Sequence, residues 1–259
     1  MNDSVDNSSY NLYLVSISYD GSSFFGWASQ PNFFTVQGFI EKRLSSIFDS
    51  NIRILSSSRT DKGVHALDQK FTFKTNLIFS NFKLKSILRK TLKDFVYVKS
   101  VKKVKKEFHP INDVIFKEYR YFINIGENNI FLKNYSWNYN SFIDVKKLRR
   151  ILNVFQGYHN FFNFSFCRER NKEIKNSCRE IDKISIVKDD NLIIIKIIAK
   201  GFLRYQIRAI IGESLLYYNN DMCISNLKER LTGEFNDKYK SIAPSSGLYL
   251  WKIKFKNIS

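Results

Sequence analysis

Apolar and polar positions follow two periodicities along the chain, one typical of strands and one typical of helices. Between 11 and 19 the residues alternate, so that Tyr13, Val15 and Ile17 share one face of a predicted strand. The first half contains six such segments: strands at 11–19, about 52–57, 70–74 and 95–104, and helices at 36–48 and 82–92. Their order along the chain is β-α-β-β-α-β.

The second half repeats this order without any visible sequence similarity to the first. Its segments are a strand at 117–125, a helix at 145–155, a hairpin of strands at 180–187 and 192–200, a helix at 202–216 that Gly212 interrupts, a small helix at 226–231 and a strand at 248–255. Pro110 breaks regular structure between the halves. We predict an α+β fold of two ferredoxin-like halves, 1–108 and 109–259, with a ligand site in the cleft between them.

A polar connection at 59–67 joins two predicted strands of the first half. It is longer than hairpin loops of about 2–5 residues, and long loops are often functional. A carboxylate, Asp61, lies between Arg59 and Lys62. The two cations would hold the carboxylate ionised, which suits a nucleophile or a base. An ordinary turn is the alternative, because Asp61-Lys62-Gly63 is good turn chemistry.

Charge adds a candidate partner. Lys and Arg number 42 and Asp and Glu 24, which gives a net charge of +18, attractive to nucleic acid. The alternative is that the positive charge only reflects an overall composition rich in Lys, Asn, Ile and Phe, without a nucleic-acid partner. Three cysteines without a Cys-x-x-Cys pair, and three scattered histidines, predict neither a disulfide framework nor a zinc site. The polar N-terminus and the short apolar runs predict no secretory signal and no membrane span, so we expect a cytoplasmic protein.

Seven stretches resemble the TruA family of tRNA pseudouridine synthases. Residues 58–66, Ser-Arg-Thr-Asp-Lys-Gly-Val-His-Ala, resemble the family signature G-R-T-D-A-G-V-H-A. Six further stretches match the family pattern in the same order along the chain, two before this signature and four after it: 19–27, 30–38, 117–121, 157–161, 201–208 and 243–250. The chain departs from the family pattern at Ser58 and Lys62, where Gly and Ala are usual, at Asp68, and at Gln206 and Ile207.

The resemblance implies an isomerase that converts uridine to pseudouridine at positions 38, 39 and 40 of the tRNA anticodon stem-loop. It implies that Asp61 is the nucleophile or base, with attack at C6, attack at C1′ and proton abstraction from C2′ all open. By resemblance, Tyr119 stacks on the flipped uracil and Arg208 pairs with Asp61. Arg59 is placed to contact phosphate or to fill the space that the flipped base leaves. Arg204 lies four residues before Arg208, and the family assigns it no role.

The family also implies a homodimer that holds tRNA across both subunits, and chemistry that needs no cofactor and no metal. Two other functions remain open. One is a non-catalytic RNA-binding module of two RRM-like halves, although neither half contains an RNP1-like run. The other is the same reaction on a different RNA. The lysine run at 102–106 is a candidate phosphate track, with a solvated face as its alternative.

Overall fold

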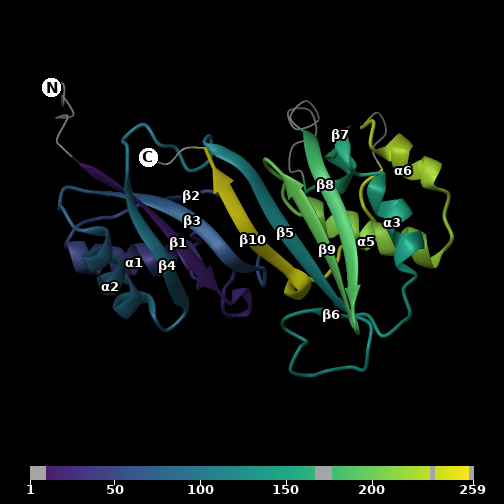
Figure 1. The fold of residues 1–259 in the computed structure, drawn as a ribbon, viewed down its shortest axis with the longest axis horizontal. Helices are drawn as coiled ribbons and strands as arrows, with labels where there is room; N and C mark the ends of the chain where they lie inside the picture. The colour runs from purple at the N-terminus through teal and green to yellow at the C-terminus, as the bar shows by residue number, and fades with distance from the viewer. Residues whose placement is uncertain (1–9, 167–176, 234–236, 257–259) are drawn as a thin grey trace.

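The computed structural model describes residues 10–166, 177–233 and 237–256, in which ten strands form one sheet (Figure 1). The elements of the first half are β1 (Asn11–Tyr19), α1 (Val36–Phe48), β2 (Ile54–Ser56), β3 (His65–Thr75), α2 (Asn81–Leu92) and β4 (Val96–Val104). Strands β4, β1 and β3 lie side by side and antiparallel, and β2 pairs with β3. The predicted order of elements in this half is therefore confirmed.

The second half adds two short strands to the predicted order. Its elements are β5 (Val114–Asn124), β6 (Trp137–Asn138), α3 (Val145–Asn153), β7 (Gly157–Asn160), β8 (Cys178–Asp189), β9 (Leu192–Ala199), α5 (Gln206–Asn219), α6 (Ile224–Arg230) and β10 (Leu248–Phe255). The sheet continues in the order β10-β5-β9-β8-β7. Strands β6 and β7 were not predicted, because segments of two and four residues are too short to show a periodicity.

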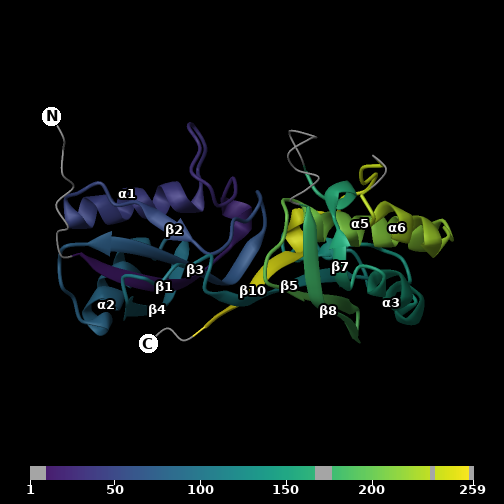
Figure 2. The ribbon, with the colours of Figure 1, turned by 90° about the horizontal axis from the view of Figure 1, so that it is seen from above.

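The two halves meet where β10 pairs with β3. This contact is parallel and includes only the pairs Tyr249↔His65 and Leu250↔Ala66, whereas β10 pairs antiparallel with β5 over most of its length. Helices α1 and α2 accompany the first-half strands, and α3, α5 and α6 accompany the second-half strands (Figures 1 and 2). The result is a mixed α+β fold around a large, mostly antiparallel sheet, which confirms the predicted class.

The predicted inner face of β1 is the more deeply buried of its two faces, since Leu12 and Leu14 on the other face are 5% and 6% exposed. Tyr13, Val15 and Ile17 are fully buried, and their ladder partners include Phe73 and Phe71 of β3. Burial of such large apolar side chains stabilises the packing of helices on this face. Phe161, Phe162 and Phe164 are buried too and belong to the core, whereas Phe166, for which the sequence had also favoured the core, is 40% exposed.

Two predicted boundaries were wrong by four residues or more. Strand β3 begins at His65, five residues earlier than predicted, because its start pairs with the end of β1 and the start of β10. Helix α5 begins at Gln206 instead of 202, because Tyr205 has a left-handed backbone (φ 65°) that a helix cannot continue.

Gly212 does not interrupt α5. A Cβ at this position would lie 2.7 Å from the carbonyl oxygen of Ser241, so the glycine lets a later segment of the chain cross the helix closely. Within the described ranges, none of the helices is both long and apolar enough to span a bilayer. The same ranges hold no cluster of three or more His, Cys, Asp or Glu side chains placed to share a metal ion; Cys167 and residues 1–9 lie outside them.

Candidate active site

Asp61 begins a tight turn between β2 and β3. The Val64 N–H donates to the Asp61 carbonyl oxygen at 3.1 Å. Gly63 takes a positive φ of 78°, and a Cβ there would lie 2.6 Å from the Ser245 hydroxyl. The ordinary-turn interpretation is therefore correct for the backbone, since glycine supplies the left-handed residue at no steric cost. This backbone conformation leaves the Asp61 side chain free for a different role.

The connection between β1 and α1 holds the Asp61 turn from one side. The Trp27 N–H donates to the Thr60 carbonyl at 3.0 Å, and the Thr60 hydroxyl bonds to the buried Tyr19 hydroxyl at 2.8 Å. A Cβ on Gly26 would come within about 3 Å of the backbone of residues 60–62, so only glycine allows this approach. The residue before Asp61 is thus fixed through both its backbone and its side chain.

Two arginines of the second half face the Asp61 carboxylate. Arg208 Nη1 lies 3.8 Å from Oδ2, and Arg204 Nε lies 4.0 Å from Oδ1. Arg208 is largely buried and is itself anchored, because its Nε donates to the Ala243 carbonyl at 2.7 Å while the Ala243 N–H donates to the Arg208 carbonyl at 2.9 Å. Both Arg–Asp distances exceed hydrogen-bond length. The carboxylate is therefore charge-paired, with lone pairs that remain available to a substrate.

Burial and charge act on Asp61 in opposite directions. Burial raises the pKa of this carboxyl and is the larger effect, whereas the charges of Arg208 and then Arg204 lower it, and the net pKa lies above the ordinary value for Asp. The side chain is still 22% exposed. A carboxylate with a raised pKa is a stronger base once ionised, and partial exposure leaves it accessible.

Tyr119 of β5 reaches the same turn from the second half. Its hydroxyl bonds to the Ser58 hydroxyl at 2.9 Å, and the Phe202 ring packs edge-on against it at 5.3 Å. Burial, followed by the charge of Asp61, raises its pKa to about 12, despite the hydrogen bond to Ser58. The hydroxyl therefore stays protonated at neutral pH. Ser58, a departure from the family pattern, supplies the partner that a glycine there would lack.

Arg59 and Lys62 are not the cations that pair with Asp61, which corrects the prediction from the sequence. Arg59 is exposed and has no ion pair among the residues that the structure describes. The Lys62 ammonium lies over the Phe25 ring, 4.4 Å from its centroid. Side chains that follow one another in a turn point to different sides of it. The cations that face Asp61 therefore come from a distant part of the chain. The spacing of four residues between Arg204 and Arg208 was the feature of the sequence that could have predicted this pair of cations, although Arg204 precedes α5.

The histidine of the signature, His65, has a structural role. His65 Nδ1 accepts from the Gly21 N–H at 3.1 Å, Nε2 donates to the Asn134 carbonyl at 2.8 Å, and the ring stacks on Tyr249 at 4.5 Å. Burial lowers the pKa of His65, so the ring is neutral at physiological pH. It links two connections and strand β10 around the start of β3.

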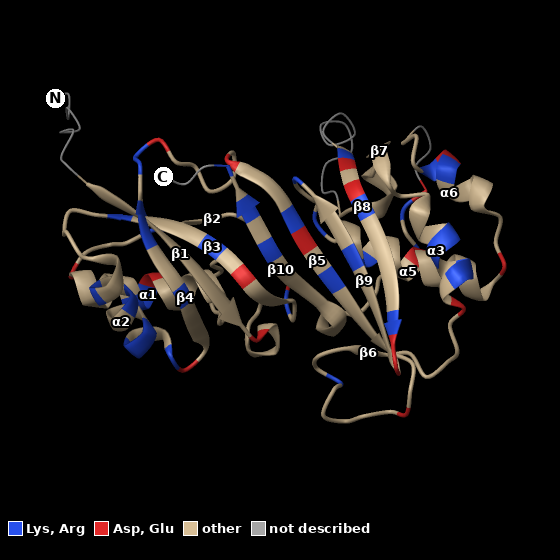
Figure 3. Cartoon of the chain, viewed as in Figure 1, with Lys and Arg blue, Asp and Glu red and all other residues tan. Residues whose placement is uncertain are grey.

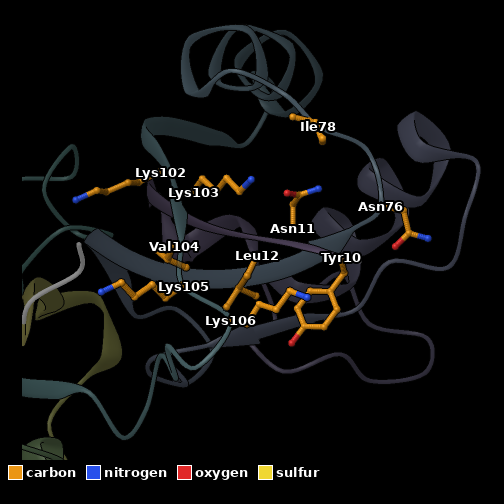
Figure 4. Close-up of a pocket in the computed structure, with 10 residues that line it drawn as sticks. All are labelled: Tyr10, Asn11, Leu12, Asn76, Ile78, Lys102, Lys103, Val104, Lys105 and Lys106. Carbon is orange, nitrogen blue, oxygen red and sulfur yellow. The ribbon is translucent and has the colours of Figure 1, made fainter. Parts of the chain in front are cut away.

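Positive charge extends well beyond this site. Lys and Arg lie along β3, β10, β5 and β9 and on α2 and α3 (Figure 3). The predicted lysine run belongs to β4 and the turn after it, and it lines a hollow with Tyr10 (Figure 4). Lys74 and Lys106 both lie over the Tyr10 ring, at 4.3 and 4.8 Å. Since β1 runs from this hollow toward the Asp61 turn, the two features lie at opposite ends of the strand.

Comparison with known proteins identifies the family. The sequence model of a family described as tRNA pseudouridine synthase matches residues 151–256. A protein named tRNA pseudouridine synthase A from Mesoplasma florum is 36% identical over 95% of this chain and 99% of its own length. Proteins of the same name from Malacoplasma penetrans and Aquifex aeolicus are 36% and 37% identical, each over 93% of this chain and 98% of their own length. The chain belongs to the tRNA pseudouridine synthase family.

Membership confirms the family predicted from the motifs and, with it, the isomerase class. The matched range 151–256 contains Arg204 and Arg208, and the relatives also cover the part of the chain that holds Asp61 and Tyr119. In this pseudouridine synthase, residues from both halves therefore converge on one carboxylate. That arrangement offers a nucleophile or base, two cations and a protonated phenol.

Proposed function

We propose that the protein converts uridine to pseudouridine at positions 38, 39 and 40 of the anticodon stem-loop of tRNA, with Asp61 as the nucleophile. The single observation that carries the proposal is the largely buried turn carboxylate of Asp61, 22% exposed and faced by Arg208 and Arg204 from the other half of the chain. Whole-length relatives named tRNA pseudouridine synthase A support the tRNA substrate.

The reaction needs only rearrangement within the substrate. The bond between C1′ and N1 breaks, the uracil turns, and a bond forms between C1′ and C5. The C5 proton is lost and N1 gains a proton, so the product is an isomer of the substrate. Asp61 suits the nucleophilic step because burial makes its carboxylate more basic, while Arg208 and Arg204 stabilise the ionised form that attacks.

The neighbouring side chains have separate roles in the proposal. Tyr119 contacts the uracil, and its protonated hydroxyl is available to donate a hydrogen bond or a proton. Arg59 contacts the RNA backbone or takes the space of the flipped base, which its exposure beside Asp61 supports. Arg208 holds Asp61 in position through its anchor on Ala243.

The larger-scale features are proposed on similar grounds. Each half is ferredoxin-like, with a boundary at 108/109, because β4-β1-β3-β2 and β10-β5-β9-β8 repeat one strand order. The substrate enters a cleft between the halves, which the origin of Asp61 and Arg208 in different halves supports. By family resemblance, the protein acts in the cytoplasm as a homodimer and uses no cofactor.

Incubation of the purified protein with an unmodified tRNA transcript, followed by mapping of pseudouridine, tests this function. The wild type and the control variant Asp182→Asn, which changes an exposed carboxylate of β8, are expected to form pseudouridine at 38–40. Asp61→Asn is expected to bind the tRNA within about two-fold of the wild type and to form no product.

Other outcomes would assign a different function. Binding without product by the wild type would favour a non-catalytic RNA-binding protein. Product at other uridines, or only in another RNA, would keep the chemistry and reject the specificity. An active Asp61→Asn variant would remove Asp61 as the nucleophile.

A further inference from the structure

The connection between β1 and α1 exposes two adjacent phenylalanines. Phe33 and Phe34 are 49% and 46% exposed, and Figure 2 shows this connection projecting beyond α1. Packing explains Phe34, whose ring stacks on Phe24 at 5.0 Å and meets Phe95 edge-on at 4.9 Å. The Phe33 ring does not pair with the Phe24, Phe34 or Phe95 rings, so packing of this aromatic cluster does not explain its exposure.

A turn directs Phe33 toward Phe25. The Phe33 N–H donates to the Gln30 carbonyl at 3.4 Å, Pro31 is the second residue of the turn, and Asn32 has a φ of 63°. Proline followed by a residue with positive φ is the pattern of a type II turn. The Phe33 and Phe25 rings stack with centroids 4.0 Å apart and an interplanar angle of 19°.

A cation and the catalytic turn complete this surface. The exposed Lys62 ammonium lies 4.4 Å from the centroid of the Phe25 ring. Phe25 precedes Gly26, whose close approach to the 60–62 backbone fixes the spacing between the two segments. Together Phe25, Phe33 and Lys62, hereafter the Phe33 platform, form an aromatic surface with a positive charge on the turn that carries Asp61.

We propose that the Phe33 platform binds a nucleotide next to the target uridine, with the base stacked on Phe33 and the phosphate paired with Lys62. The inference rests on the proposed function, because it takes RNA as the substrate at Asp61. Every base offers a π-face, and stacking on an aromatic side chain contributes to RNA affinity without sequence preference. Charge complementarity also favours RNA, since Lys62 and Arg59 are exposed cations beside an aromatic surface. The family signature has alanine where this chain has Lys62, so the platform distinguishes this chain from that pattern.

Binding of a stem-loop RNA tests the platform directly. The probe is an anticodon stem-loop with the fluorescent base 2-aminopurine at either neighbour of the target uridine, titrated into the full-length wild type, Phe33→Ala, Phe33→Trp and Lys62→Ala. Phe82→Ala is the matched control, because Phe82 is 84% exposed and lies on α2.

Stacking on the wild type is expected to quench the 2-aminopurine at one of the two neighbours. Phe33→Ala should raise Kd at least about five-fold and abolish the quenching, whereas Phe33→Trp restores both and Phe82→Ala stays within two-fold of the wild type. Lys62→Ala should raise Kd and reduce the slope of log Kd against log salt by about one. Phe33→Ala should leave that slope unchanged, which a general loss of structure would not do.

The platform and the proposed function fail in different ways. If Phe33→Ala binds and quenches like the wild type, or loses no more affinity than Phe82→Ala, the platform is overturned, whether or not the wild type makes pseudouridine. If the wild type makes no pseudouridine but binds with Phe33-dependent quenching, the platform stands and the proposed reaction falls. Absence of RNA binding by the wild type would overturn both.

Discussion

At the scale of single residues, the main feature is a carboxylate under two opposing influences. Burial raises the pKa of Asp61. The charges of Arg208 and Arg204, whose nitrogens lie 3.8 and 4.0 Å from the carboxylate oxygens, lower that pKa. Neither arginine donates a hydrogen bond at these distances, so they stabilise the charge without occupying the oxygens. The balance gives a basic carboxylate that can still approach a substrate atom.

The pH dependence of catalysis should report this balance. If Asp61 must be ionised to react, kcat/KM falls as pH drops through its pKa. Arg208→Gln removes an influence that lowers this pKa; the pKa therefore rises, and the acidic limb of the profile moves to higher pH. We expect kcat/KM at pH 6 to fall on the order of ten-fold or more.

Arg204→Gln serves as the graded comparison for this prediction. Arg204 contributes less than Arg208 to the pKa of Asp61, and its side chain is 51% exposed, so solvent screens its charge more strongly. Its acidic limb should move in the same direction by a smaller amount. The measurement is kcat/KM from pH 5 to 9. If both variants gave the same pH profile as the wild type, neither arginine would influence the titration of Asp61.

At the scale of elements, a buried carboxylate of α5 positions the segment on which Arg208 is anchored. Glu213 is fully buried and accepts hydrogen bonds from the backbone N–H groups of Lys240 and Ser241, at 2.6 and 2.7 Å, and from Arg230. Two residues later, Ala243 makes the paired hydrogen bonds with Arg208. Glu213 therefore acts on Arg208 through the path of the chain and not by direct contact.

Glu213→Gln should destabilise the protein and weaken catalysis together. The amide keeps the shape but leaves the buried Arg230 with Asp237 as its one counter-charge among the described residues, and breaking a buried pair costs about 3 kcal/mol. Thermal unfolding should show a Tm lower by roughly 6–12 °C. Glu229→Gln, an exposed change on α6, should leave Tm unchanged. Equal Tm values for both variants would contradict the proposed role of Glu213.

The elements that the sequence predicted well are those whose pattern is local. Alternation placed β1, and apolar spacing after Thr35 placed α1, whose N-cap is the Thr35 hydroxyl bonded to the Gly38 N–H at 3.3 Å. The errors arose where distant segments decide the structure. His65 belongs to β3 because β1 and β10 pair there, and α5 starts late because Tyr205 is left-handed.

The candidate site shows the same division. The family motifs at 58–66, 117–121 and 201–208 pointed to Asp61, Tyr119 and Arg208, because residue identity carries chemical information. It could not show which cations face Asp61, since that depends on the path of the chain after β9. For this reason the sequence named Arg59 and Lys62 as cations beside the Asp61 carboxylate, whereas in the structure Arg204 lies there.

At the scale of the whole molecule, the site depends on how the two halves are joined. Asp61 comes from the first half and Arg204, Arg208 and Tyr119 from the second. The backbone ladder between β3 and β10 has only two residue pairs. A short ladder alone is a weak constraint on their relative orientation, so side chains that reinforce it should affect catalysis.

Asp68 and Lys70 of β3 supply this reinforcement. Asp68 Oδ2 accepts from the Ile253 N–H of β10 at 3.1 Å, and Lys70 Nζ donates to the Ile253 carbonyl at 2.9 Å. The two side chains pair at 3.2 Å, and the Ser16 hydroxyl donates to Asp68 Oδ1 at 2.7 Å. The Asp68 and Lys70 side chains thus extend the contact between the halves beyond the end of the β3–β10 backbone ladder. Asp68 therefore belongs to the junction between the halves.

Asp68→Ala should loosen the junction without touching the substrate. The Ile253 N–H loses its acceptor and Lys70 loses its counter-charge, which costs about 1–3 kcal/mol. Amide hydrogen exchange at Ile253 should accelerate by about five-fold or more, and kcat should fall more than tRNA affinity, because Asp61 and Arg208 lose their alignment. Asp182→Ala, an exposed change on β8, is the control. Wild-type exchange at Ile253 together with full activity in Asp68→Ala would show that the backbone ladder alone holds the halves in register.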